Sequence, residues 1–84
     1  MLNKLMAILN EESNLIVNEF NDLGETTLHL ANLMNMFATV GEAGGKIYID
    51  IEEYDPMSEE YFLVSTKEYK TARGAYNYIK KMLP

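Results

Sequence analysis

The first part of the chain places its apolar residues with a helical period. Between residues 2 and 23, the apolar side chains fall on one broad face of a helical wheel, and asparagine and charged side chains fall opposite. Gly24 follows, and glycine suits the left-handed position that ends many helices. This pattern predicts one long amphipathic helix. Because Glu12 and Ser13 interrupt the apolar face, a break near residues 11–13 is the alternative.

A second helical pattern runs from about residue 25 to residue 40. Thr26 or Thr27 can cap its start, and Gly41 follows its end. Its apolar stripe comprises Leu30, Leu33, Met34, Met36, Phe37 and Val40. Since only a short connection separates the two patterns, they predict an N-terminal helical hairpin.

The period then changes from helical to alternating. From residue 46 to residue 54, isoleucines alternate with polar residues and tyrosine, which predicts a half-buried strand. Residues 55–59 have turn chemistry, and residues 61–64 are expected to return as the second strand of an antiparallel β-hairpin. An isolated hairpin is marginal in water, so we expect its isoleucine face to pack on helices. A second copy could also extend the sheet to four strands in a homodimer.

Ser65 and Glu68 have the spacing of a capping box, which predicts a C-terminal helix from residue 66 to residue 83 packed on the hairpin. Its expected core positions are Tyr69, Ala72, Tyr76, Ile79 and Leu83. Gly74 inside this helix costs about 1 kcal/mol relative to alanine, so we expect close packing there. The predicted fold class is therefore α+β, in the order α-α-β-β-α, with residues 1–84 as a single domain.

Composition and charge narrow the function classes. The chain contains no cysteine, which removes the usual marker of an oxidising compartment, and no apolar stretch long enough to span a bilayer, so the cytoplasm is the expected location. The formal net charge is −6, and no lysine or arginine occurs between Lys4 and Lys46. Phosphate backbones would be repelled there, so direct nucleic-acid binding is disfavoured. Lys70, Arg73 and Lys81 could contact phosphate, although a solvated helix face is favoured.

The sequence offers no catalytic or metal-binding constellation. His29 is the only histidine, and nothing in its spacing from Ser13, Ser58 or Ser65 indicates a nucleophile and base. A calcium loop beginning at Asp50 would need glycine and glutamate where other residues stand. We therefore predict a protein that is not an enzyme, with no cofactor and no metal, and a structural role for His29.

The most distinctive chemistry lies on the predicted hairpin, where six carboxylates stand among tyrosines. The predicted partner-binding residues are Tyr48, Asp50, Glu52, Glu53, Tyr54, Asp55, Glu59 and Glu60. Carboxylates on a rigid hairpin could attract the basic surface of a partner, such as a nucleic-acid-binding protein, and tyrosines would add interface contacts. The alternative is a hairpin that merely keeps the protein in solution. Size and charge alone resemble those of small antagonists encoded by phages or mobile elements.

The leading hypothesis is thus a non-catalytic binding module or inhibitor that engages a basic partner protein. The alternative is a structural or regulatory homodimer assembled through the N-terminal helices. Met6, Met34 and Met36 could form a partner groove on those helices, although ordinary core filling is favoured. On the C-terminal helix, Tyr78 is the tyrosine expected at the surface.

Overall fold

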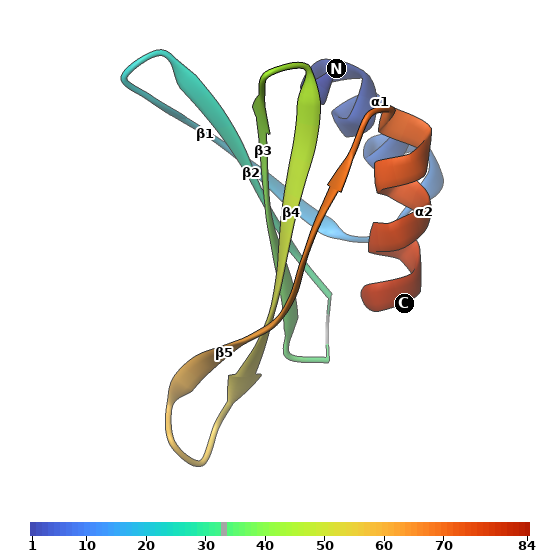
Figure 1. The fold of residues 1–84 in the computed structure, drawn as a ribbon. Helices are drawn as coiled ribbons and strands as arrows, with labels where there is room; N and C mark the ends of the chain where they lie inside the picture. Colours follow the sequence, from blue (N-terminus) through green and yellow to red (C-terminus); the bar gives the residue numbers. More distant parts are fainter. Residues whose placement is uncertain (33) are drawn as a thin grey trace.

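The computed structural model describes residues 1–32 and 34–84. In this part of the chain, one helix precedes and one follows five strands that form an antiparallel β-sheet (Figure 1). The elements are α1 (Leu2–Glu12), β1 (Ile16–Asp22), β2 (Glu25–Ala31), β3 (Met36–Ala43), β4 (Lys46–Asp55), β5 (Glu60–Tyr69) and α2 (Ala72–Met82). Each strand pairs with the next one in the chain, so the sheet is a simple meander.

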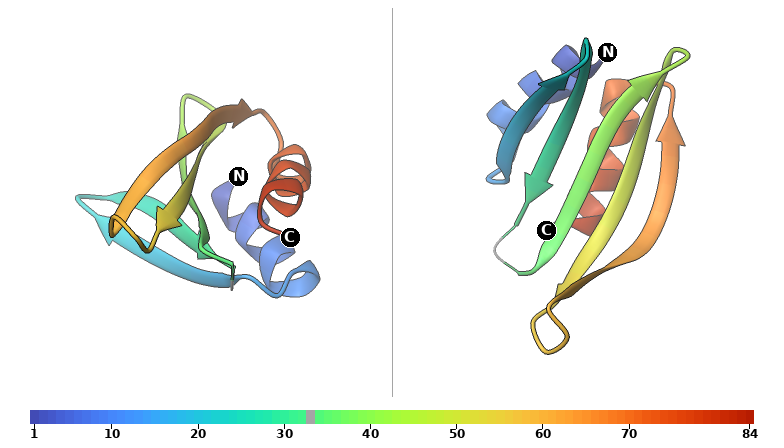
Figure 2. Two further views of the ribbon diagram at one scale, coloured as in Figure 1. Left: turned by 90° about the horizontal axis from the view of Figure 1, so that it is seen from below. Right: turned by 90° about the vertical axis from the view of Figure 1, so that its left-hand side faces the viewer.

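Both helices lie against the same face of the twisted sheet (Figure 2). The hydrophobic core fills the space between the helices and the central strands, and its fully buried members come from α1, α2 and β2–β4. They are Leu5, Leu9, Leu28, Leu30, Val40, Ile47, Ile49, Ile51 and Ile79. Neither helix, as described, is long and apolar enough to cross a membrane. The α+β character is therefore as expected, but the predicted order α-α-β-β-α is wrong.

The predicted helix over residues 2–23 is wrong beyond its first half. Helix α1 ends at Glu12, and the hydroxyl of Ser13 donates to the carbonyl oxygen of Leu9 at 2.6 Å, so the alternative break near residues 11–13 is confirmed. Residues 16–22 form β1 instead of a second half of the helix. β-branched and aromatic side chains such as Ile16, Val17 and Phe20 favour a strand, and asparagines weaken helix propensity.

The predicted second helix over residues 25–40 is also wrong. One residue of its predicted apolar stripe, Leu33, lies outside the described residues. This segment contains β2 and the first part of β3. Leu28 and Leu30 are buried, while His29 between them is exposed, which is the alternation of a strand. The helical spacing of the apolar residues was coincidental, and there is no N-terminal helical hairpin in the described chain.

Gly24 does adopt the positive φ that was expected for it, but in a different element. Leu23 has φ 51° and Gly24 has φ 81°, and together they connect β1 to β2. Two consecutive residues with positive φ are typical of a type I′ turn, whose twist matches that of the paired strands. The conformation was thus predicted correctly, whereas the structure around it was not.

The expected alternating strand is present as β4, with its isoleucines buried, but it is the fourth of five strands rather than one of two. Strand β5 continues to Tyr69, so Ser65 and Glu68 lie within a strand and the predicted capping box is wrong. Helix α2 is capped by Thr71, whose hydroxyl accepts a hydrogen bond from the backbone N–H of Gly74 at 3.0 Å. Strand pairing of Tyr69 with Ile47 delays the helix until after this residue.

The expected core of the last helix is largely confirmed. Ala72, Tyr76, Ile79 and Leu83 are buried, and Tyr69 packs against them from the end of β5. Close packing at Gly74 is also confirmed. A Cβ atom added there would lie 2.9 Å from the Thr71 hydroxyl oxygen and 3.3 Å from the Tyr69 ring.

A β-bulge changes the direction of the side chains midway along β5. Ile51 pairs with Ser65 and the next residue of β4, Glu52, pairs with Leu63, so Val64 is an extra residue in β5. Because of this insertion, Ser65 points toward the helices, while Leu63 and Tyr61 point toward the opposite face.

Candidate functional site: the helix-free face of the sheet

The sheet face turned away from α1 and α2 is called the helix-free face. Two cross-strand rows on it span all five strands. The apolar row consists of Ile16, Ala31, Phe37, Glu52 and Leu63. The polar row consists of Asn18, His29, Thr39, Asp50 and Thr66. Glu52 is thus the only charged residue in an otherwise apolar row, and neither row contains lysine or arginine.

Aromatic rings cluster above β4 on this face. The ring centroids of Phe37 and Tyr61 are 5.4 Å apart in an edge-on arrangement, and those of Tyr54 and Tyr61 are 5.0 Å apart. Phe37 comes from β3 and Tyr61 from β5, which are the two neighbours of β4. Their rings can meet only by reaching over the strand between them. This aromatic cluster of Phe37, Tyr54 and Tyr61 therefore lies directly beside the Glu52 side chain.

A shallow hollow of about 360 Å³ opens next to this cluster. Its lining includes Asn18, Phe20, His29, Phe37, Glu52 and Tyr61. The rings of Phe20 and His29 meet in a tilted arrangement with their centroids 4.5 Å apart, and Phe20 and Tyr61 are 52% and 57% exposed. Large exposed rings beside polar groups are typical of interaction surfaces rather than of a protein core.

The two carboxylates at the centre of this face differ in their surroundings. Asp50 accepts a hydrogen bond from the hydroxyl of Thr66 at 2.9 Å. Glu52 is half-buried, and within the described residues its carboxylate has neither a hydrogen-bond nor an ion-pair partner. A partly desolvated carboxylate without a partner favours the approach of a cation.

No cation of the described chain forms an ion pair with a predicted partner-binding carboxylate. Across the described chain, the ion pairs join the amino terminus to Glu42, Lys46 to Glu68, and Arg73 to Glu12. Lys46 lies on the helix-free face at the start of β4, but its partner is Glu68. The acids of the hairpin are therefore not neutralised by direct ion pairs.

The structure distributes the predicted partner-binding residues over three places. Tyr48, Asp50, Glu52 and Tyr54 alternate along β4 on the helix-free face, and Glu53 lies on the opposite face between Met36 and Phe62. The other three acids, Asp55, Glu59 and Glu60, lie at the tip of the β4–β5 hairpin. Of these, Asp55 stabilises the turn, because it accepts hydrogen bonds from the Met57 N–H at 2.9 Å and the Ser58 hydroxyl at 3.1 Å.

Two aromatic residues of this face were missed from the sequence because they were assigned to helices. Phe20 and Phe37 lie on β1 and β3, where alternate residues face the same side. The signal that could have found Phe20 is the alternation of Ile16, Asn18 and Phe20, which a strand would place on one face. Tyr61 was expected on the returning strand of the hairpin, but the bulge that turns it toward Glu52 left no clear sequence signal.

The three serines that could have acted with His29 do not share the hollow with it. Ser13 ends α1, Ser58 lies in the hairpin turn, and Ser65 contacts the Tyr78 hydroxyl on the helix side, so none of them lines the hollow with His29. Among the described residues, no group of three or more histidine, cysteine or acidic side chains could hold a metal ion.

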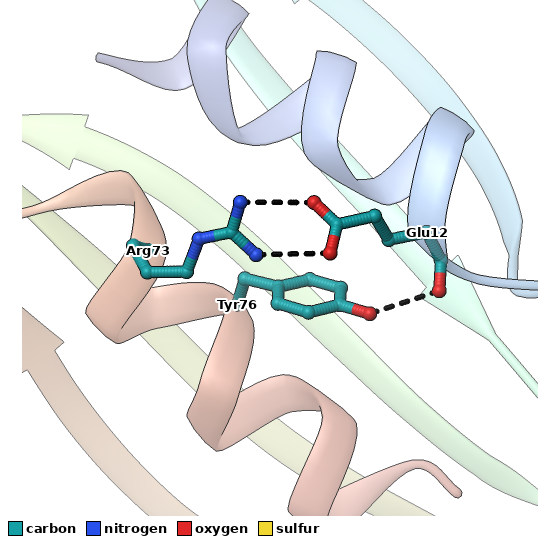
Figure 3. Close-up of polar contacts among 3 residues, drawn as sticks. All are labelled: Glu12, Arg73 and Tyr76. Atoms are coloured by element: carbon teal, nitrogen blue, oxygen red, sulfur yellow. Dashed lines mark hydrogen bonds and ion pairs between the residues drawn. The ribbon is translucent and has the colours of Figure 1, made fainter.

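The helix side contains a polar clasp between the two helices (Figure 3). Arg73 donates two hydrogen bonds to the Glu12 carboxylate, at 3.0 and 2.9 Å, and the Tyr76 hydroxyl donates to the Glu12 carbonyl oxygen at 2.9 Å. The hydrogen bonds from Arg73 lower the pKa of Glu12, and the same contact raises the pKa of Arg73. Arg73, considered above as a phosphate contact, is thus engaged in holding α1 to α2.

The remaining surface candidates are only partly where the sequence placed them. Tyr78 is half-buried, and its ring lies 5.5 Å from that of Tyr69, so it packs on β5 instead of projecting as a surface anchor. Met6 and Met36 pack against the core, as favoured, whereas Met34 is exposed.

Comparison of the chain with protein-family models, with curated proteins and with solved structures finds no match.

Proposed function

We propose that this protein is a non-catalytic binding module, or inhibitor, whose helix-free face engages the basic surface of another protein. The observation that carries this proposal is the aromatic cluster beside Glu52, in which Tyr61 is exposed and Phe37 and Tyr54 are half-buried. Within the described chain, neither Glu52 nor the neighbouring Asp50 forms an ion pair. Aromatic rings supply contact area, and unpaired carboxylates supply attraction and orientation. Behind this face the sheet is buried at Ile49 and Ile51, whereas Glu53 and Phe62 farther along the hairpin are exposed.

A protein partner fits this surface better than a nucleic acid does. Phosphate backbones require lysine and arginine, and the two complete rows of the helix-free face contain neither. A partner that normally binds nucleic acid would present the complementary basic surface. Direct binding of nucleic acid by this face is therefore not proposed.

The proposal narrows the binding surface that the sequence indicated. It rests on Tyr48, Asp50, Glu52 and Tyr54, to which the structure adds Phe37 and the neighbouring rings. It leaves out Glu53, because this residue lies on the opposite face of the sheet. The acids at the hairpin tip remain predicted contacts at the margin of the surface. Cytoplasmic location and a phage or mobile-element origin also remain predictions from the sequence.

The test compares two double variants with the same change in net charge. Asp50→Lys with Glu52→Lys reverses charge on the helix-free face, whereas Glu19→Lys with Glu53→Lys does so at exposed positions on the opposite face. Proteins captured from the native host by wild type and by both variants are identified and quantified, and the purified partner is titrated at several salt concentrations. Circular dichroism establishes that both variants fold.

We expect one basic partner to be lost from the first variant and retained by the second, with affinity that weakens as salt rises. Equal loss from both variants would refute the proposal, because net charge rather than this face would then explain binding. Full retention by both would also refute it, because the charges of this face would then not be needed. Tight binding of duplex DNA by the wild type near physiological salt would refute it as well.

A homodimer is the second candidate, through a different surface from the one expected. The sequence predicted a dimer through two N-terminal helices, but the second of these is absent, because the described part of residues 25–40 forms strands β2 and β3. Phe62, Leu63 and Val64 are instead exposed on β5, whose outer edge pairs with no other strand of the described chain. Such an edge can pair with its copy. Light scattering would show twice the mass of 9.6 kDa, and a concentration-independent monomer would exclude this candidate.

A further inference from the structure

We propose that Glu52 and the aromatic cluster of Phe37, Tyr54 and Tyr61 form a binding site for the guanidinium group of an arginine side chain. The inference rests on the proposed function, since that arginine would belong to the basic partner. It goes further by assigning one ligand chemistry to one place on the helix-free face.

The rings form a wall beside the carboxylate. Glu52 pairs directly with Phe37 on one side and with Leu63 on the other, while Tyr54 follows two residues later on the same face. Tyr61 contacts both Phe37 and Tyr54, so its ring reaches across the strand that carries Glu52. The hollow of about 360 Å³ places Phe37, Glu52 and Tyr61 on a common lining. Its volume falls in the lower part of the range for ligand pockets.

The surroundings of the Glu52 carboxylate favour the binding of a cation. Glu52 is half-buried in the apolar row, and no side chain of the described chain donates to it. Asp50 lies two residues away on the same face, so the two negative charges raise the local attraction for a cation. Asp50 is oriented by Thr66, which leaves Glu52 as the free acceptor. Apolar neighbours strengthen a charge interaction because they exclude water from it.

A guanidinium fits this arrangement better than an ammonium does. It is planar, so it can stack on an aromatic ring while its edge donates two parallel hydrogen bonds to a carboxylate. An ammonium is a compact and more strongly hydrated charge that gains less from contact with a ring face. Cation–π attraction to the rings adds to the ion pair. Anionic groups would be repelled, and a purely apolar side chain would leave Glu52 desolvated without a partner.

The test uses small probes, so it does not depend on knowing the partner. The full chain, labelled with ¹³C in its aromatic residues, is titrated with N-acetyl-arginine amide up to about 100 mM and followed by NMR. N-acetyl-citrulline amide is the neutral probe of the same shape, and N-acetyl-lysine amide is the ammonium probe. All three titrations are carried out in the same buffer, at one pH and one salt concentration.

We expect the arginine probe to shift the ring signals of Phe37, Tyr54 and Tyr61 in a saturable way. The citrulline probe should leave these signals nearly unchanged, and the lysine probe should bind several-fold more weakly. Equal shifts with arginine and citrulline, or no shift with arginine, would overturn the site. Equal affinity for lysine and arginine would overturn the assignment to a guanidinium.

Two charge-neutralising variants locate the binding. Glu52→Gln keeps the shape of the side chain and should reduce arginine binding at least about tenfold. Glu53→Gln removes the same charge from the adjacent residue on the opposite face and should bind the probe like wild type. Tyr61→Leu should weaken binding less than Glu52→Gln, because it removes one ring and leaves the carboxylate. Unchanged binding by Glu52→Gln in a folded protein would refute the proposal.

The outcomes separate this site from the proposed function. If arginine binds at the cluster but partner capture is unaffected by reversing Asp50 and Glu52, the site stands and the function is refuted. If capture depends on those charges but the arginine probe does not reach the rings, the function stands and the site is refuted.

Discussion

The two faces of the sheet are built from the same strands but have opposite chemistry. Toward the helices, successive strands contribute aliphatic side chains such as Leu28, Leu30 and Ile49, which are almost completely excluded from water. Away from the helices, the alternate residues are aromatic and acidic, and several are about half exposed. Residues that stabilise the fold therefore alternate along each strand with residues that are available to a partner. One face can therefore be altered with little effect on the other.

Neighbouring residues of β4 give the largest expected contrast. Ile49 is 0% exposed and Tyr48 is 40% exposed on the other face. Ile49→Ala removes a buried side chain and leaves a cavity, so we expect a loss of about 2–5 kcal/mol in the free energy of unfolding. Tyr48→Ala should lose about 1 kcal/mol or less. Urea denaturation measures both, and equal losses would show that the helix-free face also carries the stability of the sheet.

The helix-covered face depends on α2 beginning at the correct residue. Thr71→Ala removes the side-chain cap, so we expect a loss of about 1 kcal/mol in the free energy of unfolding. Thr71→Ser keeps the hydroxyl and should be close to wild type. Arginine binding at the helix-free face should be unchanged in both variants. A loss of probe binding in Thr71→Ala under conditions where the protein is folded would show that the two faces are coupled.

Gly74 tests the packing of the same helix turn. Replacement of glycine by alanine inside an exposed helix usually stabilises it by about 1 kcal/mol. At Gly74 the new methyl group would press on the Thr71 hydroxyl and the Tyr69 ring, so we expect this gain to be cancelled. The exposed residue Asn77 on the same helix is the control, because Asn77→Ala should gain a few tenths of a kcal/mol. A full gain at Gly74 would mean that the cap and ring move aside easily.

The Glu12–Arg73 contact between the helices should contribute little to the free energy of unfolding, and its contribution should depend on pH. The pKa of Glu12 is lowered in the folded state, chiefly by its hydrogen bonds from Arg73. Its contribution to stability is therefore present above the pKa of the unfolded chain and is lost as the pH falls through the lowered folded value. The stability difference between wild type and Glu12→Gln should vanish in acid. High salt should also reduce it, since both side chains are substantially exposed.

Among the elements with a one-sided burial pattern, β4 and α2 were predicted well, whereas β2 and β3 were wrongly assigned to a helix. The alternating isoleucines identified β4, and the buried residues of α2 were placed correctly although the helix begins later. Strand β1 was missed because it is an edge strand whose residues are nearly all exposed, so no alternation of burial constrains its sequence. Ser65 and Glu68 imitated a capping box, but their side chains contact Tyr78 and Lys46 instead.

Only part of the candidate site could be predicted from the sequence. The acidic and tyrosine residues of β4 were identified because they alternate with the isoleucines. Phe37 and Tyr61 lie on β3 and β5, the two neighbours of β4, so their contact can be predicted only when the order and register of the strands are known. Local periodicity specifies the face of a strand, whereas a site composed of several strands depends on their register.

The extra residue in β5 also sets how this strand tolerates changes in length. Loss of one residue elsewhere in the strand would send every side chain beyond that point to the wrong side of the sheet. Loss of Val64 would instead leave Leu63 opposite Glu52 and Ser65 opposite Ile51, and would only straighten the chain between them. Position 64 is therefore a place where evolution could shorten this strand without exchanging its two surfaces.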